Sequence, residues 1–212
     1  SHMLLPDIEV GLSEEARAIR DSVHKFADEV LRPAGTALDR LVDPADVIAP
    51  GSVLWKVFDG YRALGLEAME SGELGLDPVE TARLRAILHE EIGWGDSGLA
   101  ISLAVSGMHR TFARLSNRPE LLERFCRPGA TEIGCWAITE PDHGSDTLTF
   151  NHRHFADKAV RSNCIAQIDA ERDGKDWVIR GQKSAWVSNG TIADVAALFC
   201  TTRPEQGFKG GG

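Results

Sequence analysis

The chain has 212 residues, of which 42% are hydrophobic and 26% charged, and this composition excludes a disordered, collagen-like or fibrous protein. Its 23 lysines and arginines against 32 aspartates and glutamates give a net charge of −9, which argues against a surface dedicated to nucleic acid. No apolar run approaches the roughly 20 residues that a membrane-spanning helix needs. The four cysteines are scattered without a CxxC pair, so we expect reduced thiols in a cytoplasmic protein.

Helical patterns fill the first part of the chain. Ser13 is a candidate N-cap for a helix whose apolar residues recur at steps of three and four, and Pro33 is expected to close it. A loop rich in aspartate and proline is expected over residues 39–50. The apolar spacing then predicts a second helix over residues 54–64, ended by Gly65.

Three further helices are expected before the pattern breaks at Gly129. Residues 77–80, Asp-Pro-Val-Glu, combine the preferred N-cap, N1 and N3 residues, which predicts a helix from there to about Ile92. Residues 97–115 are apolar or small almost all round, which is typical of a helix at the centre of its bundle. A short helix is expected over residues 119–125.

Beyond Gly129 the apolar residues alternate with a period of two, which predicts strands. Asp173-Gly174 is a strong hairpin signal. The expected strands cover residues 132–139, 164–170, 176–180, 184–187 and 194–201. A run of helices followed by a run of strands indicates an α+β fold, with an N-terminal all-helical domain followed by an antiparallel β-domain.

The expected domain limits follow from this change of pattern. Residues 1–3 are typical of the remnant of a cleaved expression tag. The helical domain is expected at residues 4–129 and the middle β-domain at 130–212, where it stops as another strand could begin.

Two segments of the predicted β-domain carry the chemistry. The first, Cys135-Trp136-Ala137-Ile138-Thr139-Glu140-Pro141-Asp142-His143-Gly144-Ser145-Asp146, is an apolar strand that breaks into a turn. A glycine in such a turn lets backbone N–H groups approach a bound oxyanion, and a serine adds a hydroxyl. The second is Gly181-Gln182-Lys183-Ser184-Ala185-Trp186-Val187-Ser188-Asn189-Gly190.

These two segments, in this order and after a helical domain, resemble the flavin-contact motifs of the acyl-CoA dehydrogenase family. The resemblance implies FAD as cofactor and an acyl-CoA dehydrogenase-like fold. It implies that the flavin is contacted by Trp136, Ala137, Ile138, Thr139, Gly144, Ser145, Trp186, Val187 and Ser188. Within this set Thr139 would bond the polar edge of the ring and Trp186 would cover its far side. Ser145 would meet the pyrophosphate and also bind the substrate.

Simpler interpretations of the same residues stay open. Trp136 and Trp186 are also consistent with ordinary core aromatics of a β-domain, and Ser145 is consistent with an ordinary turn residue. Glu140 is expected to have a structural role at the turn. His152 and His154 share a face if extended, but no third ligand is evident, so no metal site is predicted.

The activity implied by the resemblance is α,β-desaturation of an acyl-CoA thioester, with electrons passed to an electron-transfer flavoprotein or a similar acceptor. In the family the general base is a carboxylate in a helical domain after the β-domain, so no catalytic residue is assigned within this chain, and the chain alone is expected to be inactive. The insert-like stretch 147–163 leaves the acyl group undetermined. Alternatives are a flavin-dependent oxidase or monooxygenase on the same fold, or a non-catalytic subunit; the intact protein is expected to be oligomeric.

Overall fold

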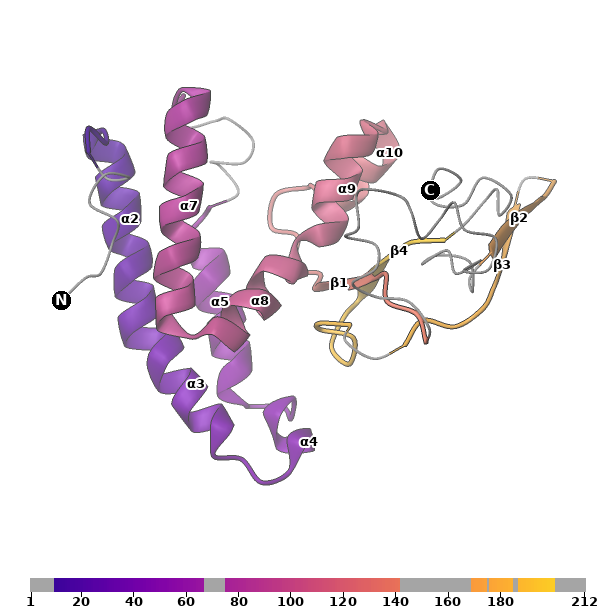
Figure 1. Ribbon diagram of the computed structural model, residues 1–212, viewed down its shortest axis with the longest axis horizontal. Helices are drawn as coiled ribbons and strands as arrows, with labels where there is room; N and C mark the ends of the chain where they lie inside the picture. The colour runs from indigo at the N-terminus through magenta and orange to yellow at the C-terminus, as the bar shows by residue number, and fades with distance from the viewer. Residues whose placement is uncertain (1–9, 67–74, 142–168, 175, 185–186, 201–212) are drawn as a thin grey trace, which may run out of the picture. The chain divides into compact units, whose positions relative to one another are not determined.

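The computed structural model describes residues 10–66, 75–141, 169–174, 176–184 and 187–200 (Figure 1). Its contacts divide the chain into two compact units, Ser1–Ala104 and Val105–Gly212. The domain limits expected at 4–129 and 130–212 stay a prediction.

The N-terminal unit begins with three consecutive helical segments: α2 (Glu14–Phe26), the π-helical η1 (Ala27–Leu31) and α3 (Arg32–Asp39). As predicted, Ser13 is the N-cap, and its hydroxyl accepts the N–H of Ala16 at 3.1 Å. The expectation that Pro33 closes this helix is wrong. Proline has no N–H to donate to the carbonyl four residues back, at Glu29, and would clash with it in a regular α-helix. The π-helical turn lengthens the hydrogen-bond spacing just before Pro33, so the helix continues past it.

Four more helices complete this unit: α4 (Pro44–Val47), α5 (Val53–Ala63), α7 (Pro78–Gly95) and most of α8 (Ser97–Ser106). The short α4 lies where a loop was expected, because Asp43 caps it and Pro44 occupies its first position. The predicted cap of α7 is confirmed, since the Asp77 carboxylate accepts the N–H groups of Val79 and Glu80 at 2.8 and 3.2 Å.

The core of the N-terminal unit lies where α2 and α7 run side by side (Figure 1). The largest fully buried side chains of this unit come from α2, η1, α5 and α7 and are aliphatic apart from one acid: Val23, Leu31, Val57, Leu84, Ile87, Leu88 and Glu91. Glu91 has a partner across the helices, since its Oε2 lies 2.7 Å from Nδ1 of His24 on α2. The two longest helices are therefore joined by apolar contacts and by one buried polar pair.

The prediction of one central helix over residues 97–115 is wrong. The chain leaves the α-helix at Gly107, whose carbonyl accepts the first N–H groups of a second helix, α9 (Met108–Ser116). Glycine is a poor helix former, which favours the break at this position. In α8 only Leu99 and Leu103 are buried, and Ile101 is 58% exposed. Part of the apolar surface of this helix is therefore not covered by any described residue.

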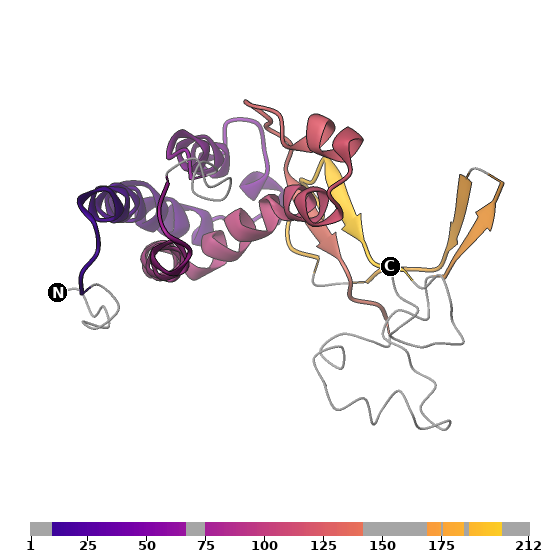
Figure 2. The ribbon, with the colours of Figure 1, turned by 90° about the horizontal axis from the view of Figure 1, so that it is seen from above.

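The C-terminal unit contains α9, α10 (Pro119–Phe125) and two pairs of strands. The pairs are β1 (Gly134–Ala137) with β4 (Val195–Leu198), and β2 (Asp169–Asp173) with β3 (Asp176–Arg180). The predicted hairpin is confirmed, because β2 and β3 are antiparallel and Gly174 in their turn has φ +59°. Helix α9 packs against both β1 and β4 (Figure 2).

The expected antiparallel character does not extend to the other pair. Strands β1 and β4 run parallel, with Trp136 opposite Ala197. Residues 138–194 connect them, and parallel strands need such a long crossover, whereas antiparallel neighbours are joined by short turns. Alternation of apolar residues does not encode strand direction, so the sequence pattern could not distinguish the two.

Among the described residues, no helix combines the length and the apolar character needed to cross a bilayer.

Candidate functional site

The end of β1 is the first part of the candidate site. Pairing with β4 continues just past the strand, because the N–H of Phe199 donates to the carbonyl of Ala137 at 3.1 Å. The chain then bends, as the N–H of Ile138 donates back to the carbonyl of Trp136 at 3.2 Å. Ile138 and Thr139 are half-buried after this bend. The sequence-predicted residues 136–139 thus lie at the point where the strand ends.

Trp136 sits in an aromatic cluster. Its ring meets that of Phe199 edge-on at 5.8 Å, and Phe199 meets Phe112 of α9 edge-on at 5.4 Å. The indole Nε1 of Trp136 is buried and has no hydrogen-bond partner in the part of the chain that the structure describes. A buried N–H without an acceptor is unfavourable by about 1–3 kcal/mol, so an acceptor brought by a ligand would stabilise this position.

The second part of the site is the turn over residues 187–190. The N–H of Gly190 donates to the carbonyl of Val187 at 2.9 Å, and Asn189 has φ +65°, a left-handed conformation that asparagine tolerates well. The side-chain amide of Asn189 donates to the carbonyl of Gly134 at 3.3 Å, which ties the turn to the start of β1. Val187 and Ser188 are both half-buried.

Lys183 and Ser184 join the two parts. The N–H of Ser184 donates to the carbonyl of Thr139 at 3.1 Å. The ammonium of Lys183 donates to the carbonyl of Ile138 at 3.1 Å and to Oε1 of Glu140 at 2.7 Å. The described parts of the two sequence motifs therefore lie side by side, and this ion pair is consistent with the structural role expected of Glu140.

Two hydroxyl residues of the site keep their donors available. The amide N–H and the hydroxyl of Thr139 make no hydrogen bond with any described residue, and neither does the hydroxyl of Ser188. Both side chains are only partly exposed. Such donors beside an apolar aromatic cluster suit a flat ligand with a polar edge.

The structure describes six of the nine predicted flavin contacts: Trp136, Ala137, Ile138, Thr139, Val187 and Ser188. The other three, Gly144, Ser145 and Trp186, lie outside the described residues. The sequence did not point to Lys183 or Asn189 as residues that hold the segments together. Their positions inside the second motif were the available signal, but their partners could not be identified from it.

The thiols near the site are not activated. Burial raises the pKa of Cys135 on β1. Burial also raises the pKa of Cys200, while the positive charge of Lys183 acts in the opposite direction. Neither thiol is therefore a ready nucleophile at neutral pH. No cluster of three or more metal-ligating side chains occurs among the residues placed by the structure.

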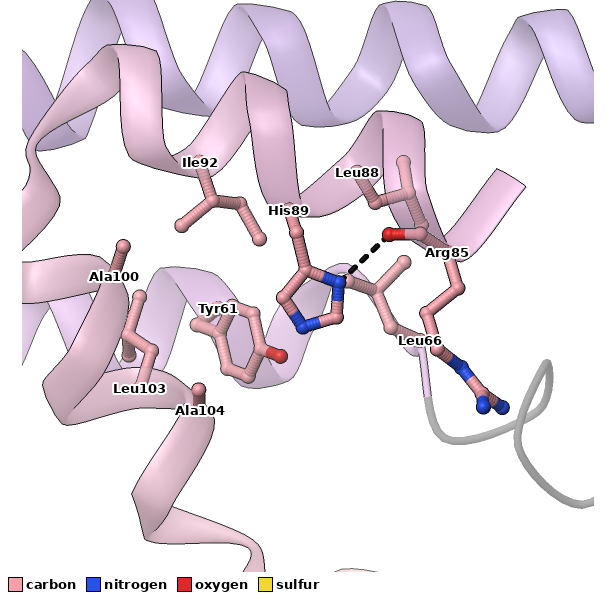
Figure 3. Close-up of a pocket in the computed structure, with 9 residues that line it drawn as sticks. All are labelled: Tyr61, Leu66, Arg85, Leu88, His89, Ile92, Ala100, Leu103 and Ala104. Carbon is pink, nitrogen blue, oxygen red and sulfur yellow. Dashed lines mark hydrogen bonds between the residues drawn. The ribbon is translucent and has the colours of Figure 1, made fainter. Parts of the chain in front are cut away.

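The N-terminal unit has a separate cavity of about 110 Å³ (Figure 3). Its lining is formed by Tyr61, Leu66, Arg85, Leu88, His89, Ile92, Ala100, Leu103 and Ala104. His89 Nδ1 lies 2.7 Å from the carbonyl of Arg85 on its own helix, and the Arg85 guanidinium points away from the apolar lining. Pockets for drug-sized ligands are usually about 300–1,000 Å³, so this cavity is small for such a role.

Comparison with known proteins agrees with the two motifs. Residues 135–211 match the family model described as acyl-CoA dehydrogenase, middle domain. The chain is 26% identical over 201 residues to cyclohexane-1-carbonyl-CoA dehydrogenase of Syntrophus aciditrophicus (strain SB), covering 93% of this chain and 46% of that protein. It is 27% identical over 208 residues to mitochondrial isovaleryl-CoA dehydrogenase of Pongo abelii, covering 95% of this chain and 43% of that protein.

A solved structure supports the same relationship. Glutaryl-CoA dehydrogenase from Mycobacterium smegmatis superposes with a TM-score of 0.57 at 27% identity, covering 92% of this chain and 45% of that one. The fold and the paired motifs are those of acyl-CoA dehydrogenase-like proteins. Residues 135–211 thus match the middle domain of the acyl-CoA dehydrogenase family, and over more than nine-tenths of its length the chain is similar to acyl-CoA dehydrogenases. It spans less than half the length of the relatives it matches.

Proposed function

We propose that this chain supplies the flavin-binding part of an FAD-dependent acyl-CoA dehydrogenase, which introduces an α,β double bond into an acyl-CoA thioester. The observation that carries the proposal is that Lys183 and Ser184 of the second motif hydrogen-bond the carbonyls of Ile138 and Thr139 in the first. The N–H and hydroxyl of Thr139 have no partner among the described residues. The relatives named above are dehydrogenases of acyl-CoA compounds, which supports the same reaction class.

The residues at the end of β1 fit an isoalloxazine ring. In the proposed complex the Thr139 N–H and hydroxyl donate to the polar edge of the ring, and Trp136 contributes an apolar surface. The buried Nε1 of Trp136, which has no partner among the described residues, would gain an acceptor from a ligand carrying oxygen and nitrogen atoms. In the proposed complex Val187 and Ser188 contact the ring from the second motif. When bound, the flavin supplies a two-electron acceptor for the substrate β-hydride.

The proposal includes three further flavin contacts at residues that the structure does not describe. Gly144 and Ser145 would approach the pyrophosphate through backbone N–H groups and a hydroxyl, Ser145 would also contact the thioester arm, and Trp186 would cover the far side of the ring. The structure describes none of the three residues.

A test of cofactor binding uses an isosteric change at the site. Thr139→Val removes one donor while keeping the side-chain shape, and it should raise the Kd for FAD about fivefold to tenfold, as expected for one lost hydrogen bond. The matched control is Thr111→Val on the exposed side of α9, which should leave the Kd unchanged. A protein that shows no flavin absorbance after incubation with excess FAD would refute the proposal.

The proton-abstracting base is expected outside residues 1–212. Removal of the α-proton needs a base within hydrogen-bond reach, while the hydride acceptor lies on the opposite face. The indole and hydroxyl groups of Trp136, Thr139 and Ser188 are not bases at neutral pH. Residues 1–212 with saturating FAD, an artificial electron acceptor and a panel of acyl-CoAs should therefore show no turnover. Turnover above the no-protein control would show that the base lies within this chain.

The electron acceptor separates the dehydrogenase from an oxidase or monooxygenase. We expect the intact reduced protein to react slowly with oxygen and to pass electrons to an electron-transfer flavoprotein or a similar carrier. We also expect it to be oligomeric and cytoplasmic. Stopped-flow oxidation in air-saturated buffer distinguishes the reactions, because rapid reoxidation would favour an oxidase.

A further inference from the structure

The ion pair between Lys183 and Glu140 is buried within the candidate flavin site. The Lys183 side chain is 10% exposed and that of Glu140 is fully buried, with 2.7 Å between Nζ and Oε1. Removing two charges from water is unfavourable by several kcal/mol per ion, and a well-packed apolar pair is often equally stable or more stable. Stability alone therefore does not explain a buried pair here, and its geometry has to be considered.

The second contact of Lys183 has a direct geometric consequence. Its ammonium donates to the carbonyl of Ile138 at 3.1 Å. That carbonyl belongs to the same peptide group as the N–H of Thr139. Because a trans peptide is planar, its C=O and N–H point in opposite directions. Holding the Ile138 oxygen on one side therefore fixes the direction in which the Thr139 N–H points on the other side.

Neighbouring hydrogen bonds fix the orientation of the backbone at the three successive residues 138–140. Lys183 binds Ile138 and Glu140, and the N–H of Ser184 binds the carbonyl of Thr139 between them. The carbonyl oxygens of Ile138 and Thr139 are thus both engaged by the second motif. The N–H and hydroxyl of Thr139 remain without a partner among the described residues. A cation on the carbonyl also polarises the peptide group, which makes its N–H a stronger donor.

We propose that Lys183, anchored by Glu140, is a positioning residue that aims the Thr139 N–H at the flavin and strengthens it as a donor. This inference rests on the proposed function, because it assumes that the ligand of Thr139 is the flavin. Donors to the polar edge of the ring stabilise its electron-rich reduced form more than its oxidised form. Lys183 therefore influences both the affinity for FAD and the flavin midpoint potential without touching the cofactor.

The test removes both charges together. Lys183→Met alone would leave the Glu140 carboxylate buried without its ammonium and should lower Tm strongly. The double variant Lys183→Met/Glu140→Gln keeps the volume and avoids an unpaired charge. It should fold with a Tm near that of wild type, bind FAD about tenfold more weakly and have a more negative flavin midpoint potential.

The control is the exposed pair of Arg118 and Glu120 on the same unit, whose side chains are 65% and 57% exposed. Arg118→Met/Glu120→Gln should change neither FAD affinity nor midpoint potential. If the first double variant is unfolded, the Thr139 amide proton of the wild type is followed by NMR instead. A shift of that resonance on addition of FAD supports the inference, and an unmoved resonance overturns it.

The outcomes separate this inference from the function on which it rests. FAD bound by the wild type and by the Lys183→Met/Glu140→Gln variant with the same affinity and midpoint potential would refute the positioning role and leave the proposed function intact. A wild-type protein that binds no FAD would refute both. A purely structural role for the pair predicts a lower Tm with an unchanged midpoint potential.

Discussion

Two glycines near the end of α7 should respond in opposite directions to the same substitution. Neither Gly93 nor Gly95 has a positive φ, so alanine fits the backbone at both. A Cβ at Gly93 would meet nothing within 4 Å. A Cβ at Gly95 would lie 2.9 Å from Leu31 Cβ and 3.0 Å from Ala27 Cβ, both on the buried side of η1. Of these two positions, Gly95 is therefore the one at which η1 packs closely against α7.

The expected magnitudes follow from two opposing effects. Alanine in place of glycine favours a helix by about 0.5–1 kcal/mol, so Gly93→Ala should raise the free energy of unfolding by up to that amount. Adding a methyl group to a filled core is unfavourable by about 1–3 kcal/mol. Gly95→Ala combines both effects and should lower the free energy of unfolding by about 1–2 kcal/mol.

Urea unfolding followed by circular dichroism measures both variants. The double variant Gly95→Ala/Ala27→Gly provides an internal check, because removing the Ala27 methyl group opens space for the new one. Ala27→Gly should thus be less destabilising in the Gly95→Ala background than in wild type. Equal stabilisation by Gly93→Ala and Gly95→Ala would refute the close approach of η1 and α7.

Three further predictions concern a cap, an ion pair and a thiol. Asp77→Ala should lower the free energy of unfolding by about 1 kcal/mol in a urea titration, because α7 loses its N-cap. Arg127 hydrogen-bonds the Glu132 side chain and lowers its pKa, so the unfolded chain binds this proton more readily than the folded one. The stabilisation from this ion pair is present above the pKa of Glu132 in the unfolded chain and is lost as the pH falls through its pKa in the folded protein. The difference in Tm between wild type and Glu132→Gln should therefore shrink on acidification. A constant difference would contradict this prediction. Iodoacetamide should label the buried Cys135 more slowly than the half-buried Cys126, as peptide mass mapping would measure; equal rates would contradict the raised pKa and burial of Cys135.

Much of the helical part could be predicted because its signals are local. The caps at Ser13 and Asp77 bond N–H groups two or three residues away, so a short stretch of sequence contains both partners. The continuation through Pro33 was missed because a π-helical turn has no comparable local signature. Glu91 was also missed as a buried residue, since its partner His24 lies on another helix.

Three of the expected strands were located, but the strand expected at residues 184–187 was wrong at both described ends, since neither Ser184 nor Val187 lies in a strand. The expected strands agree with β1, β3 and β4 to within a few residues, although the burial of side chains alternates only along β4. The direction of the β1–β4 pair depends on the path of residues 138–194, which the alternation does not contain. The antiparallel hairpin was predictable because Asp173-Gly174 encodes its turn within two residues.

In the candidate site, too, local segments could be predicted from the sequence, but the contacts between them could not. The two motifs could be recognised from sequence because each is a continuous segment, and the residues expected to touch a ligand lie within them. Their mutual position depends on Lys183, which reaches Glu140 and Ile138 more than forty residues earlier in the chain. A lysine in a polar segment usually points to solvent, so its sequence gives no reason to bury it. The structure supplies that reason, because the peptide group whose oxygen Lys183 holds carries the N–H of Thr139 on its other side.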